Sequence, residues 1–144
     1  MMSREIYDKL GGWPDELGIY GGGEHYINFT LAVLGMTINI FPTDPLYHYA
    51  APRGYHWRYD DYHRNRCIAT YTFGGERWAY RYIKNIKGGD DVKEAIYSTV
   101  VGSKSCIEHR KHIERWQVKT IASWLQEQQV ILPPDMIDTM PVEN

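Results

Sequence analysis

Apolar residues recur at every second position in the stretch that follows the N-terminal glycines. The apolar members of this alternation are Ile27, Phe29, Leu31, Val33, Met36, Ile38 and Ile40. A two-residue turn at Leu34-Gly35 would bring them all to one face of an antiparallel pair, and a shared apolar face normally fixes strand register. The pattern therefore predicts a β-hairpin over residues 27–40.

A glycine pair divides the next apolar segment into two halves of similar length. Residues 66–73 precede Gly74-Gly75, and residues 76–83 follow it. Adjacent glycines supply the positive φ angles that a tight hairpin needs. We therefore expect a second hairpin here, preceded by a further strand near residues 55–62.

Beyond residue 88 the apolar spacing becomes helical. Asp90-Asp91 can cap a helix that runs to about residue 101 and ends at Gly102, and Ser103 or Ser105 can cap the next one. The apolar positions of that next helix are Ile113, Trp116, Thr120, Ile121, Trp124 and Leu125. They follow one helical stripe that stops before the proline pair at 133–134, so the pattern predicts two C-terminal helices.

Together these elements predict an α+β fold, in which an antiparallel β-meander of four to five strands is followed by two C-terminal helices packed on one face. We expect a single domain over residues 1–144. Its first part, residues 1–23, contains an opening helix from Arg4 to Leu10 and a glycine-rich lead-in to the sheet. The sheet follows over 24–87, the helices over 88–130 and a tail over 131–144.

Composition excludes a disordered chain and argues against a membrane span. Hydrophobic residues make up 43% of the 144 residues, which is too apolar for disorder. The longest stretch without formal charge, residues 26–43, contains Asn, Thr, Gly and Pro and is a poor bilayer span. The two cysteines, Cys67 and Cys106, are too few for a disulfide framework, and no signal peptide is evident. We therefore expect a cytoplasmic protein without a membrane partner.

Charge is segregated along the chain, although the net charge is only −2. Residues 45–87 carry eight basic and three acidic side chains, whereas both flanks are net acidic. The same block holds three of the six histidines and 11 aromatic residues. Guanidinium groups match phosphate oxygens, threonine hydroxyls add donors, and aromatic rings stack on bases. This block is therefore the expected binding surface, and its ligand is expected to be an anion.

In the second expected hairpin, the aromatic face would pack under the last helix and the arginine face would point outward. The candidate ligand-binding residues are Trp57, Arg58, Tyr59, Arg64, Arg66, Thr70, Thr72, Arg77 and Arg81. The leading hypothesis is a non-catalytic binding protein that captures a phosphate-bearing ligand: a nucleotide, a cyclic nucleotide signal or single-stranded nucleic acid. The acidic flanks argue against broad, non-specific DNA binding.

Two other functions fit the same sequence. One is a protein–protein inhibitor or adaptor, such as a phage counter-defence or immunity protein, because exposed aromatic residues without an evident catalytic set suit a protein target. The other is a small metal-independent nuclease or phosphodiesterase. In that enzyme His48, His56 and His63 would act as general acid and base, and Arg58 would hold the developing phosphate charge.

Two further motifs are interpreted as structural. Residues 21–25, Gly-Gly-Gly-Glu-His, suggest a phosphate loop, but the strand expected after them would leave no helix N-terminus behind the glycines. His109 and His112 have helical spacing that allows two metal ligands, and no third is indicated. We therefore expect no cofactor and no metal. A homo-oligomer is compatible with each of the three functions.

Overall fold

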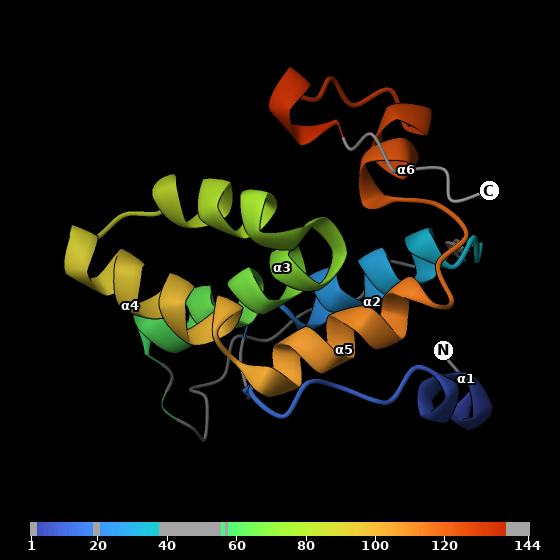
Figure 1. Ribbon diagram of the computed structural model, residues 1–144, viewed down its shortest axis with the longest axis horizontal. Helices are drawn as coiled ribbons and strands as arrows, with labels where there is room; N and C mark the ends of the chain where they lie inside the picture. Colours follow the sequence, from blue (N-terminus) through green and yellow to red (C-terminus); the bar gives the residue numbers. More distant parts are fainter. Residues whose placement is uncertain (1–2, 19–20, 38–55, 57, 138–144) are drawn as a thin grey trace, which may run out of the picture.

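The protein is helical in a computed structural model, which describes residues 3–18, 21–37, 56 and 58–137 (Figure 1). The elements are α1 (Arg4–Lys9), α2 (Gly23–Val33), α3 (Tyr59–Lys84), α4 (Asp90–Val101), α5 (Lys104–Glu114), α6 (Ile121–Glu127) and a short 3₁₀ helix, η1 (Pro134–Met136). No β-strand occurs in these described ranges. The expected α+β fold, with an antiparallel meander over 24–87, is therefore wrong.

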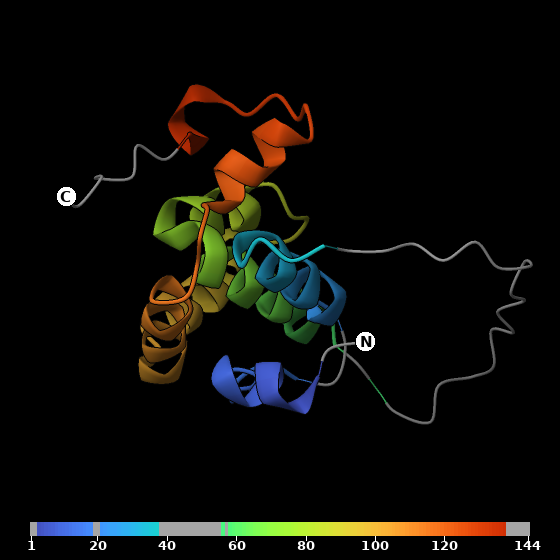
Figure 2. The ribbon, with the colours of Figure 1, turned by 90° about the vertical axis from the view of Figure 1, so that its right-hand side faces the viewer.

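The helix α3 lies at the centre of the molecule. It contacts α2, α4, α5 and α6, which surround it. In both views α6 and η1 lie on one side of this central group and α1 lies on the opposite side (Figure 2). The remaining helices therefore share α3 as their common packing partner.

Two apolar clusters fill the space around α3. The first joins α2, α3, α5 and α6, and its fully buried members include Val33, Ala69, Ile113, Ile121 and Ala122. The second joins α3, α4 and α5, and its members include Cys67, Ile68, Ala79, Val100 and Cys106. Both clusters use residues from each half of α3, so this helix is buried on several sides.

The chain reverses direction inside α3, at Gly75. Gly75 adopts φ 75° and ψ −170°, a conformation essentially restricted to glycine. Nη1 of Arg110, on α5, donates to the carbonyl oxygens of Tyr71 at 2.7 Å and Thr72 at 3.3 Å. This guanidinium satisfies acceptors that the broken helix leaves without an intrahelical donor.

The two halves of α3 lie side by side as a result. Nδ1 of His63 and the hydroxyl of Tyr82 are 2.6 Å apart, although a straight helix would separate these residues by roughly 28 Å. The hydroxyl of Tyr59 also donates to the carbonyl of Lys87 at 2.5 Å, which joins the first residue of α3 to the loop after its end. The reversal expected at Gly74-Gly75 is present, but it connects two helical segments rather than two strands.

Burial explains why the alternating patterns do not form strands. In the first half of α3 the buried residues are nearly consecutive: Cys67, Ile68, Ala69, Tyr71, Thr72 and Phe73. A helix that is buried all round shows no one-sided apolar stripe, and its β-branched and aromatic residues are also typical of strands. In α2 the residues that face the core are Tyr26, Thr30 and Val33, at spacings of four and three, whereas Ile27 is 37% exposed.

The bounds of α1 and α4 and the start of α5 agree with the sequence-based expectation. The N-terminal helix α1 lies within the range expected for it, and α4 spans Asp90–Val101 and ends at Gly102. Ser103 caps α5, because its side chain accepts a hydrogen bond from the amide of Cys106 at 3.2 Å. The bounds of α1 and α4 and the Ser103 cap are confirmed, whereas the expected cap of α4 by Asp90 or Asp91 is wrong: its N-cap is Gly89, and no side chain caps it.

The single long helix expected after Ser103 is wrong. The helix α5 ends at Glu114, and α6 begins only at Ile121, where Thr120 caps it by accepting from the amide of Ser123 at 3.0 Å. Trp116, which belonged to the expected stripe, is 43% exposed in the connection between the two helices. The apolar residues of the stripe therefore reach the core from two short helices with different directions.

Candidate functional site

The reversal of α3 assembles a group of aromatic and basic side chains, here called the Arg66 cluster: Tyr59, Tyr62, His63, Arg66 and Tyr82. The ring of His63 lies 4.2 Å from that of Tyr59 and 5.1 Å from that of Tyr62, measured between centroids. Cζ of Arg66 lies 4.3 Å from the centroid of the Tyr62 ring. One positive charge is thus held among three phenol rings and one imidazole.

The hydrogen bonds of this cluster determine which atoms of Tyr82 and His63 carry a proton. Burial lowers the pKa of His63, and the charge of Arg66 lowers it further, so the imidazole is neutral at pH 7. Burial raises the pKa of Tyr82, whose hydroxyl is hydrogen-bonded to Arg66. Because a guanidinium only donates, the Tyr82 oxygen accepts from Arg66 and its proton is donated to Nδ1 of His63. The remaining proton of His63 is therefore on Nε2.

The N-terminus of α2 lies against the same part of α3. Gly21 and Gly22 both have φ 82°. A Cβ on Gly22 would lie 2.6 Å from the carbonyl of Asn65 and 3.0 Å from the amide of Arg66, so only glycine allows this approach. No side chain caps the first amides of α2. The positive end of a helix dipole is therefore close to Arg66.

His25 and Glu24 lie in the first turn of α2, beside this helix end. Burial lowers the pKa of His25, and the charge of Arg66 lowers it further while Glu24 acts in the opposite direction. His25 is therefore within electrostatic range of Arg66, and Glu24 offsets part of the positive potential. The glycines of residues 21–23 begin a helix, which contradicts the strand that the sequence analysis expected behind them.

Arg66 differs from the other predicted arginines in its partners. Its contacts are the Tyr62 ring and the Tyr82 hydroxyl, and no carboxylate of the described residues forms an ion pair with it. Its Nε is buried without a hydrogen-bond partner in the same part of the chain. A half-buried guanidinium without a counter-charge is the strongest feature of the site, because buried cations are usually paired.

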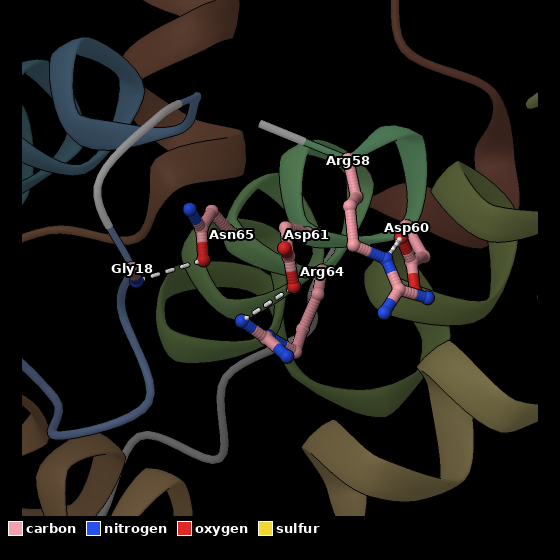
Figure 3. Close-up of polar contacts among 6 residues, drawn as sticks. All are labelled: Gly18, Arg58, Asp60, Asp61, Arg64 and Asn65. Carbon is pink, nitrogen blue, oxygen red and sulfur yellow. Dashed lines mark hydrogen bonds and ion pairs between the residues drawn. The ribbon is translucent and has the colours of Figure 1, made fainter. Parts of the chain in front are cut away.

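Arg58 and Arg64 are neutralised at the start of α3 (Figure 3). Nη2 of Arg58 lies 2.6 Å from Oδ2 of Asp60, and Nη2 of Arg64 lies 3.0 Å from Oδ1 of Asp61. The amide of Gly18 donates to Oδ1 of the buried Asn65 at 3.0 Å in the same region. The two aspartates complement the helix dipole as well as the arginines, so this end of α3 does not present a basic surface.

Arg77 and Arg81, on the second half of α3, bind Asp135 of η1. Arg81 forms an ion pair with the carboxylate of Asp135, and Nη1 of Arg77 donates to the main-chain carbonyl of the same residue at 2.6 Å. The strip of outward arginines expected on one hairpin face is therefore wrong. Its three arginines are divided between two regions of α3, since Arg77 and Arg81 contact Asp135 and Arg66 contacts Tyr62 and Tyr82.

The two predicted threonines point into the structure. The hydroxyl of Thr70 donates to the carbonyls of Arg66 at 3.1 Å and Cys67 at 2.9 Å, within its own helix. Thr72 is 2% exposed. Neither threonine therefore offers a donor to a ligand on the surface. Trp57 lies outside the described residues.

The residues of the predicted nuclease set do not come together in the described part of the chain. His48 lies outside it, and His56 is exposed. His63 is bound to Tyr82 through Nδ1, whereas Arg58 pairs with Asp60. No group of three or more His, Cys, Asp or Glu side chains there is placed to hold a metal ion. The chemistry that the Arg66 cluster can perform is recognition of an anion through fixed donors.

Comparison of the chain with protein-family models, curated proteins and solved structures finds no match. Within the described ranges, no helix has both the length and the apolar character needed to cross a bilayer.

Three contributors to the site region were missed by the sequence analysis. They are the N-terminus of α2 at residues 21–23, His25, and Tyr82 as the hydrogen-bond partner of His63. A signal for the first was present, because Tyr26, Thr30 and Val33 follow a helical repeat directly after the glycines. The Tyr82 contact depends on the reversal of a helix and has no local signature.

Proposed function

We propose that the protein is a non-catalytic binding protein that captures a phosphate-bearing ligand at the Arg66 cluster. The observation that carries the proposal is Arg66, a half-buried guanidinium without a carboxylate partner among the described residues. The nearby N-terminus of α2 and the Nε2–H of His63 add donors around it. Phosphate oxygens are the anionic groups that such a combination of guanidinium and helix N-terminus binds best.

A nucleotide fits the cluster better than free phosphate because an aromatic ring lies on the same helix face. Tyr59 is 43% exposed, and its ring is held in place by His63 and by the bond to Lys87. Residues 59 and 66 are about 10 Å apart along the helix, and the side chain of Arg66 runs back over Tyr62 toward Tyr59. A base stacked on Tyr59 would leave its phosphate within reach of Arg66.

The other arginines support a small ligand over a long nucleic acid. Arg58, Arg64 and Arg81 are paired with aspartates, and the net charge is −2. Tight non-specific binding to DNA or RNA needs many unpaired cations along one surface. The proposed ligand is therefore a nucleotide, a cyclic nucleotide or a short stretch of single-stranded nucleic acid.

Titration calorimetry with inorganic phosphate, nucleoside monophosphates, cyclic nucleotides and short single-stranded oligonucleotides tests the proposal. Arg66→Gln removes the unpaired charge and is expected to weaken nucleotide binding by about 10-fold or more, because a charge-assisted hydrogen bond is lost. Arg58→Gln is the matched control, since Arg58 lies on the same helix but is paired with Asp60. Absence of binding to every ligand, or equal losses in the two variants, would contradict the proposal.

A second candidate is the protein–protein inhibitor or adaptor, and exposed apolar residues favour it. Ile131 is 96% exposed and Val118 is 70% exposed, and Trp116 lies beside Val118 in the chain. Substituting Ile131→Asp and Val118→Asp leaves the Arg66 cluster unchanged. If the protein binds a protein target through these exposed side chains, a complex captured from a native host lysate should be lost in that double variant and retained in Arg66→Gln.

A further inference from the structure

The chain binds one of its own acidic residues across α3. Asp135 of η1 uses its carboxylate to pair with Arg81 and its main-chain carbonyl to accept from Arg77 at 2.6 Å. The two arginines are four residues apart and therefore lie on the same face of the second half of α3. Both arginines thus contact one residue of a segment that lies more than 50 positions away in the sequence.

The segment around Asp135 has the form of a short peptide ligand. Pro133 has φ −58° and ψ 144°, an extended conformation of the polyproline type. Leu132 and Met136 pack partly against the core on either side of the acidic residue. The segment from 132 to 136 therefore combines two apolar anchors with one carboxylate, which is a common form of peptide recognition.

This contact is weak enough to be replaced. The side chains of Arg81 and Asp135 are 38% and 56% exposed, and solvent screens a surface ion pair of this kind, so it contributes little to stability. Ile131, directly before the segment, is 96% exposed and adds no packing. The arginines are thus covered by a tethered segment that a competing ligand of the same chemistry can displace.

We propose that the face of α3 formed by Arg77 and Arg81 is a docking site for an acidic, proline-containing peptide segment of a partner protein, and that residues 132–136 occupy it as an internal ligand. Charge complementarity identifies the occupant, because the group held by the two arginines is a carboxylate with its own main-chain carbonyl. The apolar anchors favour a peptide over free phosphate. This site is separate from the Arg66 cluster and does not depend on the proposed nucleotide binding.

A fluorescence anisotropy titration of the full chain with a labelled peptide of residues 131–137, Ile-Leu-Pro-Pro-Asp-Met-Ile, tests the site. Asp135→Asn in the protein removes the internal carboxylate and is expected to tighten peptide binding by about 2- to 5-fold, the range of one exposed ion pair. Arg77→Gln together with Arg81→Gln is expected to weaken it by about 5-fold or more. Arg58→Gln is the control, since its pairing with Asp60 is unrelated.

Three results would overturn the proposal. The first is equal peptide affinity in the wild type, Asp135→Asn and the double arginine variant. The second is equal affinity for a peptide in which the aspartate is replaced by asparagine. The third is a dimer of the wild type that light scattering detects and Asp135→Asn abolishes, because the occupant would then be a second copy of this chain. If the double arginine variant does not fold, the peptide affinities of the wild type and Asp135→Asn alone test the proposal.

Discussion

At the scale of single residues, His109 is the buried group with the largest consequence for pH. It is 8% exposed, and its ring centroid lies 5.7 Å from that of Tyr26. Burial lowers its pKa to about 4, and His112 acts in the same direction while Asp15 and Glu16 act against it. Its Nε2 has no hydrogen-bond partner in the described part of the chain. The folded protein therefore holds His109 neutral at pH 7.

The low pKa of His109 predicts a loss of stability in acid. Its ordinary pKa is 6.5, so the unfolded chain takes up the proton first as the pH falls. The stabilisation is complete above pH 6.5 and is lost toward pH 4, which lowers the free energy of unfolding by up to about 3 kcal/mol. Urea denaturation at pH 7.5 and at pH 4.5 measures this difference.

Two substitutions separate His109 from the other titrating groups. His109→Phe should reduce the difference in unfolding free energy between the two pH values. His56→Gln, at an exposed position, should leave it as in the wild type. An unchanged pH dependence in His109→Phe would contradict this assignment, and the effect would then come from the other groups whose pKa values are lowered, which include His25 and His63.

At the scale of the elements, the reversal of α3 depends on one backbone conformation. Gly75→Ala places a Cβ in a region that only glycine adopts freely, 3.3 Å from Nη1 of Arg110. We expect it to lower the free energy of unfolding by about 1–3 kcal/mol and to weaken the contact between His63 and Tyr82. Chemical denaturation measures the first effect, and the shift of the His63 ring resonances in NMR spectra reports the second.

Gly23→Ala is the matched control for this prediction. Gly23 is helical, and a Cβ there meets no atom within 4 Å. Alanine at this position should be neutral or stabilising by roughly 0.5–1 kcal/mol, because glycine loses more backbone entropy in a helix. Equal stability of Gly75→Ala and the wild type would contradict the role assigned to Gly75.

The elements that could be predicted from the sequence are those defined by local chemistry. Ser103 as a cap and Gly102 as a helix end are each visible in a few adjacent residues. That residues 59–84 form a helix rather than strands was not predictable in this way. The run from Cys67 to Phe73 is buried on several sides, so its apolar residues show no helical stripe. The pair Gly74-Gly75 correctly indicated a reversal, since glycine permits a turn between helices as readily as between strands.

At the scale of the whole molecule, the sites depend on contacts between distant segments. The basic and aromatic composition of residues 45–87 predicted a binding surface, which stays a prediction, and three of its residues, Tyr59, His63 and Arg66, lie close together in the structure. The shared partner of Arg77 and Arg81 was hidden, because Asp135 is 54 residues from Arg81 in the sequence. The partners of Arg58 and Arg64, Asp60 and Asp61, lie within three residues of them and were visible in the sequence. Charge composition alone therefore overestimated the free positive charge of this block.

The bond between Tyr59 and Lys87 makes the 59–87 segment a closed loop of chain, with Gly75 at one end and the phenol–carbonyl contact at the other. Fraying of either half from its terminus breaks this contact with the other half. We therefore expect amide protons on the two halves to exchange with solvent as a single opening unit. Because the Tyr59 ring also contacts His63, we expect a ligand bound at the proposed site to slow the opening of the whole unit.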